Sequence, residues 1–146
     1  MSKRLDVLKA VKALVQAALP SAQVIGLDGE EAAPDRIPPT GRVIVRSGDP
    51  GGPEVDLSPL TYNYSHPIPV EIAAYESGSL ASEEVLDDMM GRIGAGLAAD
   101  RTLGGLCDWI EADAPLTDDI YASGARPPRS ADLVITAAYS TPDPLN

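Results

Sequence analysis

The sequence predicts an α+β domain in which an antiparallel sheet of about four strands carries two helices on one face. Segment 3–19 and a segment that begins at Ser82 repeat apolar residues at helical spacing, whereas the stretches between and after them alternate at strand spacing. The resulting order is helix, hairpin, helix, hairpin. Strands joined by hairpins are antiparallel, so a doubly wound parallel sheet is not expected. We expect a single domain, 1–146, with an extended hairpin and long loops.

The first helix has one apolar stripe, formed by Leu8, Val11, Val15 and Leu19. Pro20 ends it, and a short strand is expected at 23–26. Lys9 and Lys12 interrupt the apolar run, which therefore predicts neither a signal peptide nor a membrane span. We expect no membrane partner and a protein made and kept in the cytoplasm.

The first hairpin begins with strand 42–47. Its alternation places Val43 and Val45 on one face, and Arg42, Ile44 and Arg46 on the other. Glycine and proline at 48–53 predict a turn, after which the chain returns through 60–75. Pro67 and Pro69 fall inside the return strand, which predicts two collinear pieces or a bulged edge strand.

The second helix is expected to start with Ser82 as its N-cap, followed by Glu83 and Glu84 at the positive end of the helix dipole. Its buried stripe is predicted to be Leu86, Met89, Met90, Ile93 and Leu97. Three helix glycines, Gly91, Gly94 and Gly96, are expected to permit close packing on the sheet. Strands follow at 106–112 and 131–139, with an exposed loop at 115–130 between them.

No catalytic group, metal site or cofactor site is predicted. His66 is the only histidine, and the adjacent Ser65 would point to the opposite face of a strand, so a structural role is favoured. Cys107 is the only cysteine, which excludes an intramolecular disulfide and favours a buried, inert thiol. The glycine-rich turns match neither a P-loop nor a dinucleotide fingerprint. Nothing in the sequence indicates an enzyme.

The net charge of −11 argues against a free nucleic-acid binder, which needs Lys and Arg to neutralise phosphates. An acidic surface keeps a protein soluble, and it also suits the wall of a channel through which DNA slides. The charge is uneven. Residues 3–12 carry Lys3, Arg4, Lys9 and Lys12 against Asp6, whereas 83–119 carry ten acids against Arg92 and Arg101. Such polarity would suit head-to-tail packing of identical subunits.

Four segments carry a resemblance to a known family: 42–51 (RVIVRSGDPG), 62–72 (YNYSHPIPVEI), 100–106 (DRTLGGL) and 138–141 (AYST). In order and pattern the chain resembles the tail terminator, or tail completion, proteins of long-tailed siphophages and related phage-like particles. These are small α+β domains with an N-terminal helix, an antiparallel sheet and a helix packed across it.

The resemblance implies a hexameric ring that caps the head-proximal end of the tail tube, stops its polymerisation and presents a docking surface to the head-tail connector or stopper. Its partners would be itself, the tube protein and the connector, with DNA only as passing cargo, and it would reside in the virion. Candidate subunit or tube contacts are Arg42, Arg46, Asp49, Pro50, Gly51, Arg126 and Arg129. Candidates for an acidic ring or lumen surface are Glu83, Glu84, Asp87, Asp88 and Asp100.

Three alternatives remain open at this point. Another neck component, such as a head-completion or connector protein, would have the same general layout. A small-molecule enzyme, for example an acyl or CoA transferase, would require Cys107, His66 and a carboxylate to meet in one cleft. A cellular binding module working as a monomer or dimer is the third.

Overall fold

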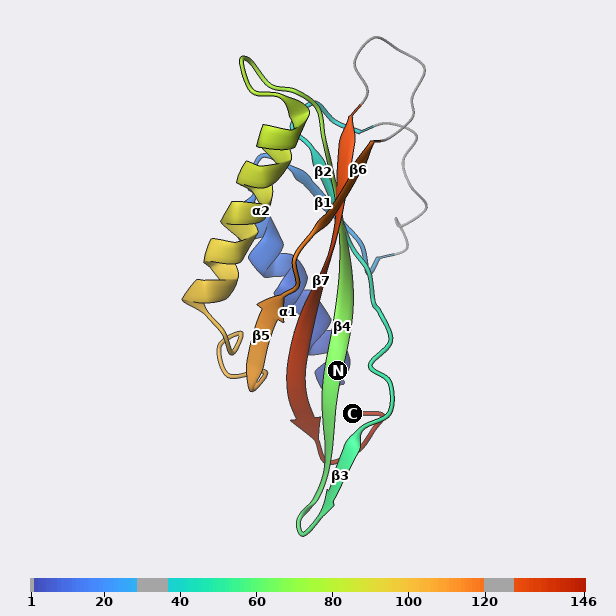
Figure 1. The fold of residues 1–146 in the computed structure, drawn as a ribbon. Coiled ribbons are helices and arrows are strands. Elements are labelled where there is room, and N and C mark those ends of the chain that lie inside the picture. Colours follow the sequence, from blue (N-terminus) through green and yellow to red (C-terminus); the bar gives the residue numbers. More distant parts are fainter. Residues whose placement is uncertain (1, 29–36, 120–127) are drawn as a thin grey trace.

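The computed structural model describes residues 2–28, 37–119 and 128–146, and within them two helices and one mixed sheet of seven strands form an α+β fold (Figure 1). In chain order the elements are α1 (Lys3–Ala18), β1 (Gln23–Ile25), β2 (Arg42–Val45), β3 (Glu54–Leu57), β4 (Leu60–Ala74), α2 (Ser82–Ala99), β5 (Trp109–Ala112), β6 (Leu116–Asp119) and β7 (Arg129–Thr141). Neither of these helices is long and apolar enough to cross a membrane.

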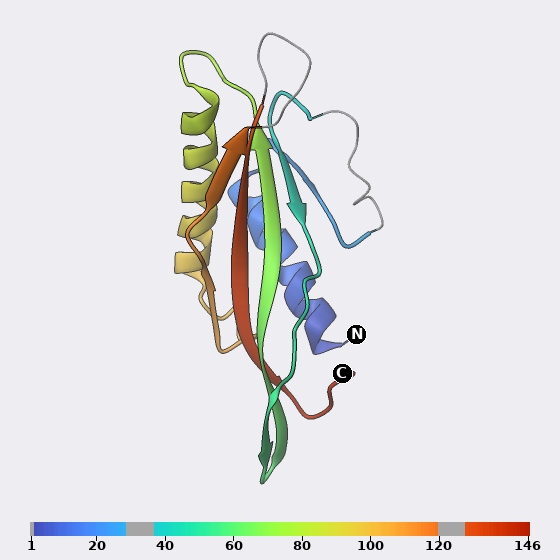
Figure 2. The ribbon, with the colours of Figure 1, turned by 45° about the vertical axis from the view of Figure 1, so that its right-hand side comes forward.

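The sheet is built around one long antiparallel ribbon. β4 and β7 pair from Tyr62–Thr141 to Ala74–Arg129. Short strands flank the ribbon on both sides: β2 and β3 follow one another along the free edge of β4, and β5 and β6 along that of β7 (Figures 1 and 2). β1 adds to β2 in parallel orientation and completes the order β1-β2-β4-β7-β5.

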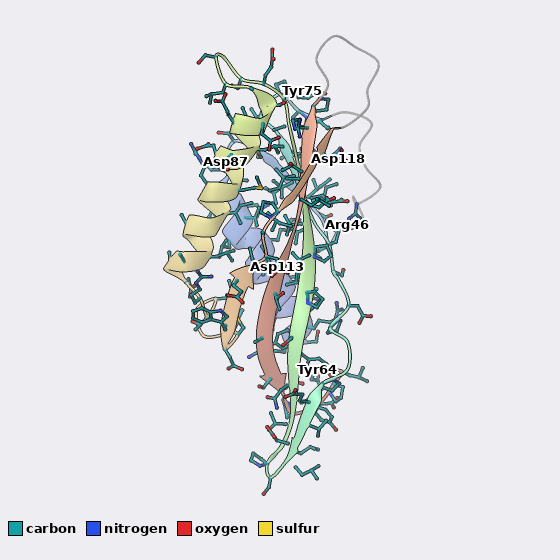
Figure 3. All side chains as sticks on the ribbon, in the orientation of Figure 1. Arg46, Tyr64, Tyr75, Asp87, Asp113 and Asp118 are labelled. Atoms are coloured by element: carbon teal, nitrogen blue, oxygen red, sulfur yellow. The ribbon has the colours of Figure 1, made fainter. Side chains whose placement is uncertain are left out.

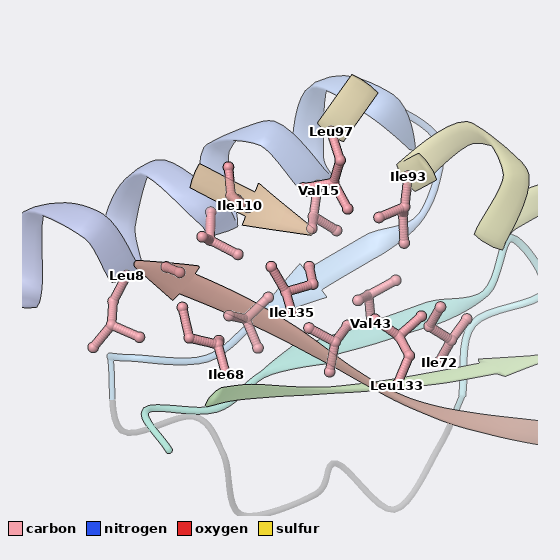
Figure 4. Packing of buried hydrophobic residues seen from close by; sticks show 14 of the residues in the cluster. Leu8, Val15, Val43, Ile68, Ile72, Ile93, Leu97, Ile110, Leu133 and Ile135 are labelled. Atoms are coloured by element: carbon pink, nitrogen blue, oxygen red, sulfur yellow. The ribbon is translucent and has the colours of Figure 1, made fainter. Parts of the chain in front are cut away.

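Both helices pack on one face of this sheet and enclose the core with it (Figure 4). Alternate strand residues face the helices because side chains of a strand point to opposite sides in turn. The fully buried aliphatic side chains include Leu8 and Val15 of α1, Ile93 and Leu97 of α2, and Ile68 and Ile135 of the ribbon. Each contributes about 1.5–3 kcal/mol by leaving water.

The predicted helix stripes are confirmed except at one position. Leu8, Val11, Val15 and Leu19 are buried, as are Leu86, Met89, Ile93 and Leu97, whereas Met90 is only partly buried. The start of the second helix differs from the prediction: Ala81, not Ser82, is its N-cap, and Glu84 Oε2 accepts from the Ala81 N–H at 2.8 Å.

The prediction that the α2 glycines pack on the sheet is wrong. A Cβ on Gly96 would lie 3.1 Å from Leu14 Cδ2 of α1, whereas Gly91 and Gly94 have nothing within 4 Å. The one close approach is therefore between the two helices. The remaining two glycines face open space.

The predicted sheet of four antiparallel strands is also wrong in detail. β1 runs parallel to β2. β3 forms between the predicted turn at 48–53 and the predicted return strand at 60–75, and β6 forms within the predicted exposed loop at 115–130. Strand 106–112 is shorter than predicted, since β5 begins at Trp109. Residues before it form a turn in which Thr102 O accepts from the Gly105 and Cys107 N–H groups, with Gly104 and Gly105 at positive φ.

The prolines of β4 do not interrupt it. Arg46 N–H donates to Pro69 O at 2.9 Å, so the backbone polar groups of residues 69 and 67 face the β2 edge rather than β7. The N–H groups that proline lacks are therefore missing only on that edge. The ladder between β4 and β7 continues past both positions, and the strand is a single piece of 15 residues.

Candidate assembly surfaces

A hairpin of β3 and the first residues of β4 projects beyond the end of the helices (Figures 1 and 2). Pairing of Val55 with Tyr62 and of Leu57 with Leu60 places these four side chains on one face. Val55, Leu57 and Leu60 are 46%, 82% and 48% exposed. We call this set of four residues the hairpin apolar face.

The opposite face of the hairpin is polar and internally bonded. Asn63 donates from its amide to Asp56 Oδ2 at 2.9 Å and to Glu54 O at 3.3 Å. Its Oδ1 accepts from the Ser140 hydroxyl at 2.6 Å, which ties the hairpin to β7. The hairpin is thus amphipathic, and its polar face is the one fixed to the rest of the sheet.

The segment that leads from β2 to the hairpin is fastened to β4 by His66. This side chain is fully buried, and its Nε2 lies 2.6 Å from Ser47 O, a carbonyl that can only accept. Nε2 therefore carries the proton, and Nδ1 accepts from the Tyr139 hydroxyl at 3.0 Å. Burial lowers the pKa of His66, which favours this neutral form. The side-chain bond replaces the backbone pairing that Pro67 cannot make.

His66 and Cys107, the two candidate catalytic groups of the enzyme alternative, both have structural surroundings. His66 has both ring nitrogens engaged, as described above. Burial raises the pKa of the Cys107 thiol, and Asp108 and Asp100 raise it further, which disfavours the reactive thiolate. Within the described ranges, no group of three or more His, Cys, Asp and Glu side chains is placed to hold a metal ion.

The residues predicted as one contact surface lie in three separate places. Arg42 and Arg46 face away from the helices, where Arg46 pairs with Glu71 at 2.6 Å (Figure 3). Pro50 and Gly51 line a cavity of about 260 Å³ with residues from both chain ends, and Asp49 Oδ1 accepts from the Gly51 N–H at 2.9 Å. Arg126 lies outside the described residues.

Arg129, the seventh of these residues, belongs to a different neighbourhood. It starts β7, and its Nε lies 2.6 Å from Glu83 Oε2 in the first turn of α2. A predicted contact residue and a predicted lumen residue thus form an ion pair with each other.

The acidic residues of α2 remain on its outer surface. Asp87 is exposed (Figure 3), and Asp88 pairs with Arg92 one turn later at 3.0 Å. Glu84 caps the helix start, and Asp100 at its end accepts from the Gly104 N–H at 3.1 Å. Four of the five predicted residues, all but Asp87, therefore also stabilise local structure, while the patch stays accessible.

An apolar groove between the two helices was not predicted from the sequence. It has a volume of about 680 Å³. Ala10, Ala13, Leu14 and Ala17 of α1 line one wall, and Ala95, Gly96 and Leu103 are among the residues lining the other. Arg92 and Asp100 also border it. The sequence signal that could have revealed this groove is the set of α1 alanines at helical spacing outside the predicted buried stripe.

Comparison of the sequence with protein-family models gives no match, and comparison with curated proteins gives no relative.

Proposed function

We propose that this chain is a structural subunit of a long-tailed phage particle that caps the head-proximal end of the tail tube as a hexameric ring. The cap would end polymerisation of the tube and offer a docking surface to the head-tail connector. The residue pattern that resembles tail terminators and the α+β fold with two helices on one face of a sheet support this proposal.

The hairpin apolar face is the observation that carries the proposal. Two-stranded hairpins are marginally stable alone in water, and exposed clusters of large apolar side chains typically mark protein contacts. Here Leu57 and Leu60 sit on a projecting ribbon whose polar side is already bonded to β7. A surface of this shape suits a subunit that binds other proteins.

Charge supports the placement of the subunit around DNA. Glu83, Glu84, Asp87 and Asp88 lie within the first two turns of α2, and Asp100 closes its far end. Lining a ring with this helix would give the lumen a negative surface, which repels phosphates and lets DNA pass without sticking.

Electron microscopy of particles produced with the gene inactivated tests the proposal, with the intact gene supplied in trans as control. Filled heads separated from tails of uncontrolled length are the expected result. Tails of normal length lying detached from filled heads would instead identify another neck component. Normal, infectious particles would refute both assignments.

A second experiment asks whether the outward side of β2 contacts a neighbour. Changing Arg42 and Arg46 together to glutamate removes the ion pair with Glu71 and reverses the charge of this surface. If the surface is a contact, the variant fails to complement the inactivated gene although it remains folded. Full complementation would exclude this strand from the interface.

A further inference from the structure

We infer that the hairpin apolar face of one copy docks into the groove between α1 and α2 of a second copy. This inference rests on the proposed function in treating the protein as a ring subunit, and it names the surfaces that join neighbouring subunits. The hairpin and the groove lie in different parts of the molecule, so the contact requires two copies (Figures 1 and 2).

The hairpin offers a narrow apolar ridge. β3 spans four residues, or about 13 Å at the usual rise of a strand. Along it Val55 and Leu57 alternate with Glu54 and Asp56, so the apolar side chains lie on one side and the acids on the other. Leu60 and Tyr62 of β4 widen the ridge across the pair.

The groove matches the ridge in length and in chemistry. Its α1 wall runs from Ala10 to Ala18, about 12 Å at the rise of a helix. Small side chains, including the exposed Ala13, Ala17 and Ala95, leave room for larger ones to enter. Leucines on a ridge and alanines in a groove are complementary in volume.

Charge favours a copy of this chain as the occupant. The hairpin belongs to a stretch, 47–91, that contains no Lys or Arg and includes Asp49, Glu54 and Asp56. α1, which forms a wall of the groove, carries Lys3, Arg4, Lys9 and Lys12 against Asp6. Lys9 is exposed and lies one turn before Ala13 on the same stripe. Glu54 and Asp56 lie on the side of the hairpin away from the ridge, Lys12 already pairs with Asp28, and Arg92 and Asp100 border the α2 wall. Charge therefore adds a longer-range attraction between the acidic hairpin and the basic start of α1 rather than direct ion pairs.

Because ridge and groove are different patches, the contact is heterologous. Each copy gives its hairpin to one neighbour and accepts the hairpin of another, an arrangement that generates a ring when the rotation between copies closes. The same contact serves a ring of any size, so it does not depend on six subunits.

Sedimentation velocity of the purified full chain tests this contact without any phage particle. The concentration is raised to about 1 mM, at which self-association with a dissociation constant of about 1 mM is still detected. Leu57→Asp should weaken self-association about tenfold or more, since it removes a leucine that the inferred contact would bury. Leu145→Asp makes the same change at an 86% exposed position outside the hairpin and should have no effect.

A matched pair tests the groove. Ala13→Glu adds volume and negative charge to its wall, whereas Gln16→Glu adds the same charge to an exposed α1 position outside it. Only Ala13→Glu should weaken association. In a Cys107→Ala background, mixing the Leu57→Cys protein with the Ala13→Cys protein under oxidising conditions should give a disulfide-linked heterodimer. Mixing the Leu57→Cys protein with a Ser65→Cys protein should not.

A chain that stays monomeric throughout, or association that Leu57→Asp and Ala13→Glu leave unchanged, would overturn the inference. Neither outcome bears on the particles formed without the gene. Conversely, normal particles in that experiment would remove the phage function while leaving a measured self-association through these surfaces in place.

Discussion

Replacing Gly48 with alanine tests how closely the segment between β2 and β3 approaches β4. Gly48 has φ of 65°, and a Cβ built there would lie 2.0 Å from Pro67 O. The neighbouring atom is a backbone carbonyl of β4 that faces the β2 edge, and it cannot rotate away as a side chain can. Gly51 provides a matched control, because its φ is 69° and nothing lies within 4 Å of the added Cβ.

The two substitutions share one energetic cost and differ in the other. Alanine in the left-handed conformation costs about 1–2 kcal/mol at either position. At Gly48 the chain must also move away from Pro67, which disturbs the bonds of Ser47 O to His66 and of Arg46 N–H to Pro69 O. Each hydrogen bond contributes about 0.5–1.5 kcal/mol. We expect Gly51→Ala to lower the free energy of unfolding by about 1–2 kcal/mol and Gly48→Ala by about 2–5 kcal/mol.

Urea unfolding followed by circular dichroism measures the free energy of unfolding of both variants. An unchanged slope of that free energy against urea concentration would show that the same surface is exposed on unfolding. Amide exchange of the residues around His66 should accelerate in Gly48→Ala but not in Gly51→Ala. Equal destabilisation of the two variants, within about 0.5 kcal/mol, would refute the close approach, since the two disturbed hydrogen bonds should add at least about 1 kcal/mol at Gly48.

Three further predictions concern His66, the aliphatic core and the glycines of α2. His66 is the only histidine, and burial lowers its pKa in the folded protein. As pH falls the unfolded state binds the proton first, so the contribution of His66 to stability is complete above pH about 6.5 and is lost below it. Urea titrations at several pH values should show this dependence in the native protein and not in His66→Gln. Ile135→Ala should cost about 2–5 kcal/mol in the same assay by opening a cavity in the core. Gly91→Ala should raise the thermal midpoint through a gain of up to about 1 kcal/mol in helix propensity, and Gly96→Ala should raise it less because a leucine of α1 must move.

Helices were the part of the fold most open to prediction from sequence. Each buried stripe recurs over about three turns, and the charged residues between its members lie on the other side, so the pattern is long and unambiguous. The error at Met90 has a simple cause: it adjoins Met89, and consecutive helix residues point about 100° apart, so only one faces the sheet.

Strands were harder because their pairing depends on distant segments. β1 has only three residues, and nothing in them states that β2 will lie alongside in parallel. The one large apolar residue of β6 is Leu116, and its side chain is 72% exposed. Neither hydrophobic pattern nor burial therefore marks β6 as a strand. What holds it is the backbone ladder with β7, which sequence does not display.

The candidate surfaces were predicted in part. Asp49, Pro50 and Gly51 of the predicted turn were expected to contact neighbours, but residues 54–57 after that turn were not predicted to form a strand. The alternation of Glu54, Val55, Asp56 and Leu57 was the available signal for a strand with one apolar side. The groove required knowledge of how α1 crosses α2, which no local pattern contains.

The difference in rise between strands and helices explains why an apolar face is left uncovered at all. β4 has 15 residues and extends about 50 Å, whereas the 16 residues of α1 extend about 24 Å and cannot cover it. A protein that worked alone would gain solubility from polar residues on both sides of such an overhang. Instead, the stripe of β4 that faces the helices at Ile68 continues outward through Tyr64 and Tyr62 to Leu60. The sequence thus keeps its core-facing pattern as far as Leu60, which lies beyond the core and is 48% exposed. The contact that we infer between copies would cover it.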